Sequence, residues 1–146
     1  MTKVSDKQNM RWQQEKMKRT GCVLWALSRM LDVDYGMLAT WFSVANQDPR
    51  LHADIEAVLA DHGYDLVPTT LDDKGKLRFV EAMFEDGSGE GHAWYVDEDE
   101  RVWGLGPDPS VPCDSVAAEK FMRDQQLRIE RVVLIVRSAV LADGLE

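Results

Sequence analysis

Cys22 is the first residue of this chain whose side chain suggests catalytic chemistry. It lies at the start of an apolar stretch at 21–31, GCVLWALSRML, in which only Ser28 and Arg29 are strongly polar. Apolar residues on nearly all sides predict a buried helix. Unpaired N–H groups and partial positive charge at a helix N-terminus favour a thiolate, so the pKa of a thiol placed there tends to fall. Cys22 is therefore a candidate nucleophile, although a free cysteine that serves as a small core residue is a common alternative.

Two further residues with catalytic chemistry lie in the C-terminal half. His92 follows the glycine-rich loop 86–91 and begins a predicted strand, and Asp108 follows the next strand. A tight hairpin between these strands brings the start of the first close to the end of the second. We therefore expect His92 and Asp108 to lie side by side at one end of a sheet. A thiol, an imidazole and a carboxylate from separate regions are typical of a thiolate–imidazolium catalytic site.

Each residue type has a defined role in that chemistry. Cys22 would attack a carbonyl carbon, and His92 would hold the thiolate and then protonate the leaving group. Asp108 would orient the imidazole and stabilise its charged form. The oxyanion would be bound by the backbone N–H of Cys22 and by an upstream amide side chain, for which Gln14 and Gln13 are both candidates.

The same residues also have ordinary structural explanations. His92 can be a strand-end histidine bonded to the loop, and Asp108, which precedes a proline, can be a turn residue. Gln14 can lie on a helix surface. Asp97 is a second candidate for orienting the imidazole, but strand alternation places it on the face opposite His92. The sequence alone does not decide between these alternatives.

The order of these features resembles that of the papain-like cysteine peptidases, and most closely that of the domain that removes bacteriocin leader peptides after a double glycine. The resemblance implies that Cys22 is the nucleophile, His92 the base and Asp108 the orienter. It also implies that Gln14 contributes to the oxyanion hole. The implied fold has an N-terminal helical half whose buried, Cys-bearing helix packs on a C-terminal antiparallel sheet. The stretches that carry the resemblance are QQEKMKRTGCVLWALSRML, GHAWYVDEDERVWGL and PDP.

Hydrophobic periodicity predicts a helical N-terminal block followed mainly by strands, which is the α+β pattern. We expect Gly21 to end a first helix before the buried helix begins. The strand at 92–97 alternates between two sets of residues and is predicted to be half-buried. One domain over residues 1–146 is expected, with a frayed tail at 138–146. The predicted helices are 5–19, 21–31, 37–45, 51–62 and 114–124, and the predicted strands are 64–68, 77–84, 92–97, 101–105 and 127–136.

Composition limits the class of protein. The chain of 146 residues is 45% hydrophobic and 29% charged, which is typical of one soluble globular domain. It contains no run of roughly 18 apolar residues and no secretory signal, so we expect a cytoplasmic protein that does not bind membranes. Cys22 and Cys113 are then expected to be free thiols. We find no metal-ligand spacing and no glycine-rich phosphate loop, which predicts neither a metal nor another cofactor.

The net charge of −9 argues against general nucleic-acid binding. The charge is uneven, because residues 1–20 carry +4 and the remainder carries −13. The basic segment can dock on the acidic body or serve as an arm for a partner, and the acidic body can attract basic substrates. His52 and His62, near the two ends of the predicted 51–62 helix, are expected to be surface or capping residues.

Two hypotheses of function follow from these patterns. The first is a cysteine peptidase or amidase that cleaves a peptide or protein substrate through a thioester at Cys22. The alternative is a papain-like domain that has lost catalysis and that blocks or sequesters a protein partner. The identity of the substrate and the oligomeric state are not encoded in any pattern that we can interpret.

Overall fold

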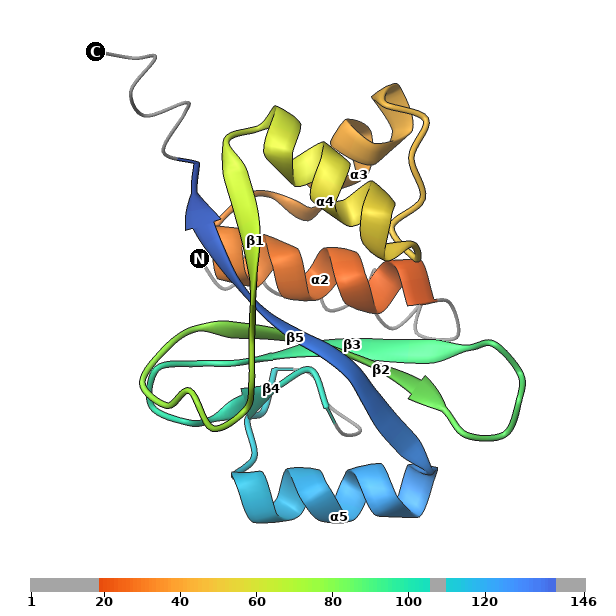
Figure 1. Cartoon of the computed structure of the whole chain (residues 1–146), viewed down its shortest axis with the longest axis vertical. Helices are drawn as coiled ribbons and strands as arrows, with labels where there is room; N and C mark the ends of the chain where they lie inside the picture. Colours follow the sequence, from red (N-terminus) through yellow and green to blue (C-terminus); the bar gives the residue numbers. More distant parts are fainter. Residues whose placement is uncertain (1–18, 106–109, 139–146) are drawn as a thin grey trace.

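The computed structural model describes residues 19–105 and 110–138, in which helices pack on both faces of one antiparallel sheet (Figure 1). The helices of this part of the chain are α2 (Arg19–Leu31), α3 (Tyr35–Val44), α4 (His52–Asp61) and α5 (Ser115–Gln125). Its strands are β1 (Tyr64–Thr69), β2 (Arg78–Phe84), β3 (Gly91–Val96), β4 (Val102–Trp103) and β5 (Leu127–Arg137).

The five strands pair in the order β1–β5–β2–β3–β4, and every pairing is antiparallel. The last strand along the chain, β5, lies between β1 and β2 and so completes the centre of the sheet. β2 and β3 form a hairpin in which Ala82 is opposite His92 and Glu81 is opposite Ala93. The predicted α+β class is confirmed, and a helical block precedes most of the sheet.

Helix α2 lies at the centre of the larger core. All residues from 21 to 28 are buried, as the apolar stretch predicts. Trp25 and Leu27 belong to one core cluster with Phe79 of β2 and Tyr95 of β3. α3 and α4 lie on the same side of the sheet as α2 and complete this cluster (Figure 1).

The expectation that Gly21 ends a helix is wrong. Gly21 lies inside α2, which already includes Arg19, and Cys22 is the fourth residue of the helix as it is described. A helical glycine costs about 1 kcal/mol relative to alanine. Burial of the apolar residues that follow outweighs this cost, since most helical stability in proteins comes from tertiary packing.

Strand β3 is buried on both faces, so the prediction of a half-buried strand is wrong. Ala93 and Tyr95 join the core beneath α2, whereas Trp94 and Val96 join a second core. The reason is α5, which lies across the opposite face of the sheet (Figure 1). Alternation along a strand shows which residues share a face but not which faces are covered.

Two predicted helix starts have the capping interactions that their sequences suggest. Asp34 precedes α3, and its carboxylate accepts a hydrogen bond from the Gly36 N–H at 2.9 Å. Asp114 precedes α5, and its carboxylate accepts from the Ala117 N–H at 2.8 Å. These bonds satisfy N–H groups that have no partner within the helix.

Gly63 ends α4 with a φ of +89°, as expected of a glycine after a helix. Its carbonyl accepts a hydrogen bond from the Ser138 N–H at 2.8 Å. The predicted frayed tail at 138–146 is therefore wrong at its first residue, because this bond anchors Ser138. The other residues of that tail lie outside the described residues, as does the predicted helix at 5–19 except for its last residue.

The predicted return strand at 101–105 is shorter than expected, because β4 contains only Val102 and Trp103. The backbone turns at Gly104, whose φ is +86°. A Cβ added there would lie 2.9 Å from the Trp25 ring and 3.5 Å from the Trp94 Cβ. The chain can pass between the Trp25 ring and the Trp94 Cβ only because residue 104 has no side chain.

We expect Gly104→Ala to destabilise the fold much more than Gly87→Ala. Gly87 also has a positive φ, +77°, but no atom lies within 4 Å of an added Cβ. Gly87→Ala therefore carries only the backbone cost of about 1–2 kcal/mol. Gly104→Ala adds an overpacking cost of about 1–3 kcal/mol. Urea denaturation of both variants measures the difference, and equal losses of unfolding free energy would refute the tight packing around Gly104.

Candidate functional site

The sulfur of Cys22 lies against the beginning of β3. The Ala93 N–H donates a hydrogen bond to the Cys22 Sγ, with a nitrogen–sulfur distance of 3.3 Å. This bond fixes the sulfur beside the backbone of β3. The Cys22 residue is only 2% exposed. Helix α2 thus places the thiol beside the backbone of Ala93, the residue that follows His92.

The imidazole of His92 is held by the backbone just after β4. Its Nε2 lies 2.7 Å from the Gly104 carbonyl oxygen. A carbonyl oxygen can only accept, so Nε2 carries a proton and donates it to this bond. In the neutral ring Nδ1 is then the basic nitrogen. The ring also stacks on Trp94, with 5.7 Å between the ring centroids.

The hairpin geometry explains how a residue that begins β3 meets a residue that follows β4. The strands pair at Tyr95–Trp103 and at Val96–Val102, so the chain returns alongside itself. The expectation that the start of the first strand lies near the end of the second is confirmed by the bond from His92 to Gly104.

Asp97, the second candidate for orienting the imidazole, belongs to the tip of this hairpin. Its carboxylate accepts hydrogen bonds from the Trp103 Nε1–H at 2.9 Å and from the Arg101 N–H at 3.0 Å. Burial alone would raise the pKa of Asp97, but these donors outweigh burial and lower it. The hydrogen bonds of the Asp97 carboxylate thus stabilise the turn between β3 and β4.

Three predicted residues of the site cannot be placed. Asp108, Gln14 and the alternative Gln13 lie outside the described residues, so their roles stay predictions. Neither Cys113 nor Cys22 forms a disulfide; Cys113 is half-buried and Cys22 is fully buried. Burial raises the pKa of Cys113, with a smaller contribution from the neighbouring Asp114 carboxylate.

A buried ionic cluster on the α2 side of the sheet was not predicted. The Glu81 side chain is fully buried, and it accepts a hydrogen bond from the Arg131 Nε–H. The His52 Nε2 lies 3.3 Å from the same carboxylate, and the Arg131 Nη1–H donates to Glu56 at 2.8 Å. Because Glu81 is opposite Ala93, this cluster shares the sheet face on which Cys22 packs.

His52 is partly exposed at the start of α4, as expected, but its ring also reaches the buried Glu81 carboxylate, which was not predicted. A signal for the cluster was present in the sequence. Glu81 interrupts the apolar strand FVEAMF, and Arg131 interrupts IERVVLIV. A charged residue within a buried strand needs a partner of opposite charge. The expectation for His62 is confirmed, because it is the residue that caps the C-terminus of α4.

Comparison of the chain with protein-family models, with curated proteins and with solved structures gives no match. Among the described residues no group of histidine, cysteine, aspartate or glutamate side chains is arranged to hold a metal ion. None of the helices in this part of the chain is long and apolar enough to cross a membrane.

We expect Glu81→Leu alone to lower the unfolding free energy by about 3–5 kcal/mol, because it leaves the Arg131 charge without its buried partner. The double variant Glu81→Leu/Arg131→Met should recover most of this loss, since it removes both charges. Urea denaturation of the singles and the double gives the coupling energy.

A control for this cycle is the exposed Lys120–Asp124 pair on α5, whose charged atoms lie 2.7 Å apart. Asp124→Ala should change stability by less than about 1 kcal/mol. If the losses of the two Glu81 and Arg131 single variants simply added in the double variant, the pairing of these charges would not contribute to the fold.

Proposed function

We propose that this chain is a thiol hydrolase of the cysteine peptidase or amidase type, with Cys22 as nucleophile and His92 as base and acid. The observation that carries the proposal is the hydrogen bond from the Ala93 N–H to the Cys22 Sγ at 3.3 Å. It places the only fully buried cysteine of the described residues beside the residue that follows His92. A thiol with an adjacent imidazole is the arrangement that nucleophilic catalysis by cysteine requires.

The orientation of His92 supports the role of base. The Gly104 carbonyl accepts the Nε2–H and thereby fixes which ring nitrogen is basic. Nδ1 can then take the thiol proton and form an imidazolium. Conversion of the ring to its charged form strengthens its bond to the carbonyl, because charge-assisted hydrogen bonds are stronger than neutral ones.

The reaction would proceed in two balanced halves. The thiolate adds to the carbonyl carbon of an amide, and the carbonyl π electrons move to oxygen. When the intermediate collapses, the C–N bond breaks, and the amine leaves with the proton that His92 had taken from Cys22. Water then adds to the thioester and gives a proton to His92, and collapse releases the carboxylic acid product and restores the thiol.

The resemblance to papain-like peptidases supports this proposal at the level of architecture. A helix that carries the cysteine packs on an antiparallel sheet whose strand β3 carries the histidine. By the same resemblance Asp108 would support the imidazolium and Gln14 would bind the oxyanion. The substrate would be a peptide or protein.

A second candidate function is favoured by the burial of the thiol. Cys22 is 2% exposed, so the residue offers almost no surface to a substrate in this structure. A papain-like domain that keeps the core position of the cysteine but has lost catalysis would show such burial. The chain would then bind a protein partner and block or sequester it.

Alkylation by iodoacetamide between about pH 4 and 9 separates the two functions. The experiment uses a Cys113→Ser background, which removes the second thiol. If the chain is a thiol hydrolase, we expect fast alkylation of Cys22 well below pH 8.5, the ordinary pKa of a thiol. His92→Ala should slow the reaction near pH 6 by about tenfold or more. His62→Ala, which removes a histidine at the end of α4, is the matched control and should change nothing.

An alkylation rate that follows an ordinary thiol titration and is unchanged in His92→Ala would contradict the hydrolase. Alkylation that stays slow at every pH, with and without His92, would support the inactive binding domain. Either result would favour the second candidate function, in which the chain binds a protein partner.

A further inference from the structure

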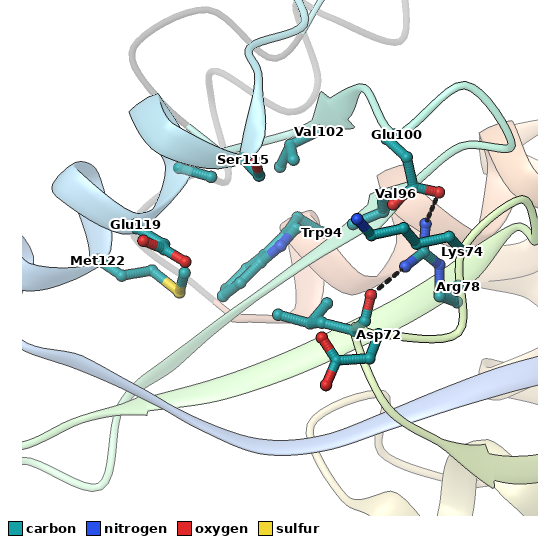
Figure 2. Close-up of a pocket in the computed structure, with 12 residues that line it drawn as sticks. Asp72, Lys74, Arg78, Trp94, Val96, Glu100, Val102, Ser115, Glu119 and Met122 are labelled. Atoms are coloured by element: carbon teal, nitrogen blue, oxygen red, sulfur yellow. Dashed lines mark hydrogen bonds and ion pairs between the residues drawn. The ribbon is translucent and has the colours of Figure 1, made fainter.

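A cavity of about 290 Å³ lies between α5 and the sheet face opposite α2 (Figure 2). Its apolar wall is formed by Trp94 and Val96 of β3, Val102 of β4, and Ala118 and Met122 of α5. Cavities of this size are uncommon in a well-packed interior. A concave site with mostly apolar walls and a few polar groups is the usual form of a small-molecule site.

The cavity exists because α5 presents small residues to a sheet face that carries large ones. The only fully buried residue of α5 is Ala118, and Ser115 lies one turn before it. The indole of Trp94 stands opposite these small side chains, and Figure 2 shows it rising from the strand between α5 and the connection that leads to β2. The helix is thus held away from part of the sheet.

One end of the cavity is lined by an ion pair between a buried arginine and a half-buried glutamate. The Arg78 side chain is 1% exposed, and its Nη2–H donates to the Glu100 carboxylate at 2.6 Å. Its other donors bond to the carbonyls of Leu71 at 2.5 Å and Lys76 at 2.8 Å. Arg78 holds the pKa of Glu100 below its ordinary value. The two charges of this pair therefore offset one another, and neither is left for a ligand to balance.

Two carboxylates near the cavity have no such partner. The side chains of Asp72 and Glu119 form no hydrogen bond or ion pair with any described residue. In Figure 2 they lie on either side of Trp94, Glu119 on α5 and Asp72 on the connection that precedes β2. The remaining charged group is Lys74, an exposed side chain whose charge acts on Glu100 and lowers its pKa further.

We infer that this cavity binds a small organic cation with an apolar stem, such as an alkylammonium or alkylguanidinium ion. The stem would lie against Val96, Val102 and Met122 and bury apolar surface. The cationic head would lie at the mouth of the cavity, within reach of the two unpaired carboxylates, while the buried Trp94 contributes apolar wall. The net charge of −9 raises the local concentration of cations around the whole chain.

This site is separate from the proposed catalytic centre. Trp94 belongs to the core beneath α5, whereas Ala93, which bonds to the Cys22 sulfur, belongs to the core beneath α2. The Cys22 sulfur and the cavity therefore lie on opposite faces of the sheet, whereas the His92 ring stacks on Trp94, which lines the cavity. Binding in the cavity does not depend on whether Cys22 is a nucleophile, so either proposal can fail without the other.

Three probes that share a six-carbon alkyl group and differ in their polar head group test the inference. Hexylammonium, 1-hexanol and hexanoate are titrated into the full chain and followed by the NMR signal of the Trp94 indole N–H. We expect hexylammonium to bind about fivefold or more tightly than 1-hexanol, and hexanoate to bind most weakly. Hexanoate that binds as tightly as hexylammonium would overturn the inference, as would saturable binding of none of the three.

Variants on α5 locate the binding. Ala118→Leu fills the cavity and should abolish the titration, whereas Ala117→Leu adds the same atoms to an exposed position and should leave it unchanged. Glu119→Gln, an exposed substitution that does not threaten folding, should raise the dissociation constant for hexylammonium about fivefold. Asp124→Asn, outside the cavity, is its control. Unchanged affinity in both Ala118→Leu and Glu119→Gln would refute the site.

The same cationic chemistry occurs in free amines and in the side chain of lysine. A Gly-Gly-Lys-Gly-Gly peptide, titrated in parallel, separates these sources. If the peptide binds and Glu119→Gln weakens it, the site accepts a polypeptide side chain. If only hexylammonium binds, the site is confined to free small cations. Both results require the cavity and the carboxylates.

Discussion

The close approach of backbone and indole at Gly104 is the constraint on which the candidate site depends. The residue turns with a positive φ and passes so near the Trp25 ring that a side chain would not fit. The same residue points its carbonyl at the His92 Nε2. The core beneath α2 thus fixes the backbone that orients the imidazole, and the position of α2 also sets where the Cys22 sulfur lies. Gly104 is therefore needed both for the packing of the core and for the orientation of the imidazole.

Much of the fold could be predicted because its signals are local. The apolar run from Val23 to Leu27 indicates a buried helix without any knowledge of its partners. Asp34 and Asp114 mark helix starts, and Gly63 marks a helix end, through interactions within a few residues. The hairpin that returns to His92 follows from two short strands and a charged turn. These elements are enough to place a cysteine-bearing helix before a histidine-bearing strand.

The remaining features arise from contacts between distant segments, which periodicity does not reveal. That α5 covers the second face of β3 depends on how the chain crosses the sheet, so periodicity does not reveal the cavity that Trp94 lines. The pairing of Glu81 with Arg131 joins two strands that are far apart in the chain. The tie between Arg78 and Glu100 likewise depends on the register of a hairpin. Each charged residue was visible in the sequence, but its partner was not.

The most direct test of the central claim, that Cys22 and His92 titrate as a pair, is an NMR titration of the His92 ring in the Cys113→Ser background and in the same background with Cys22→Ala. The account predicts that the ring takes up its proton at a higher pH when the thiol is present, because a thiolate stabilises the imidazolium. Identical titration midpoints with and without Cys22 would contradict the pair and leave Cys22 as a core residue.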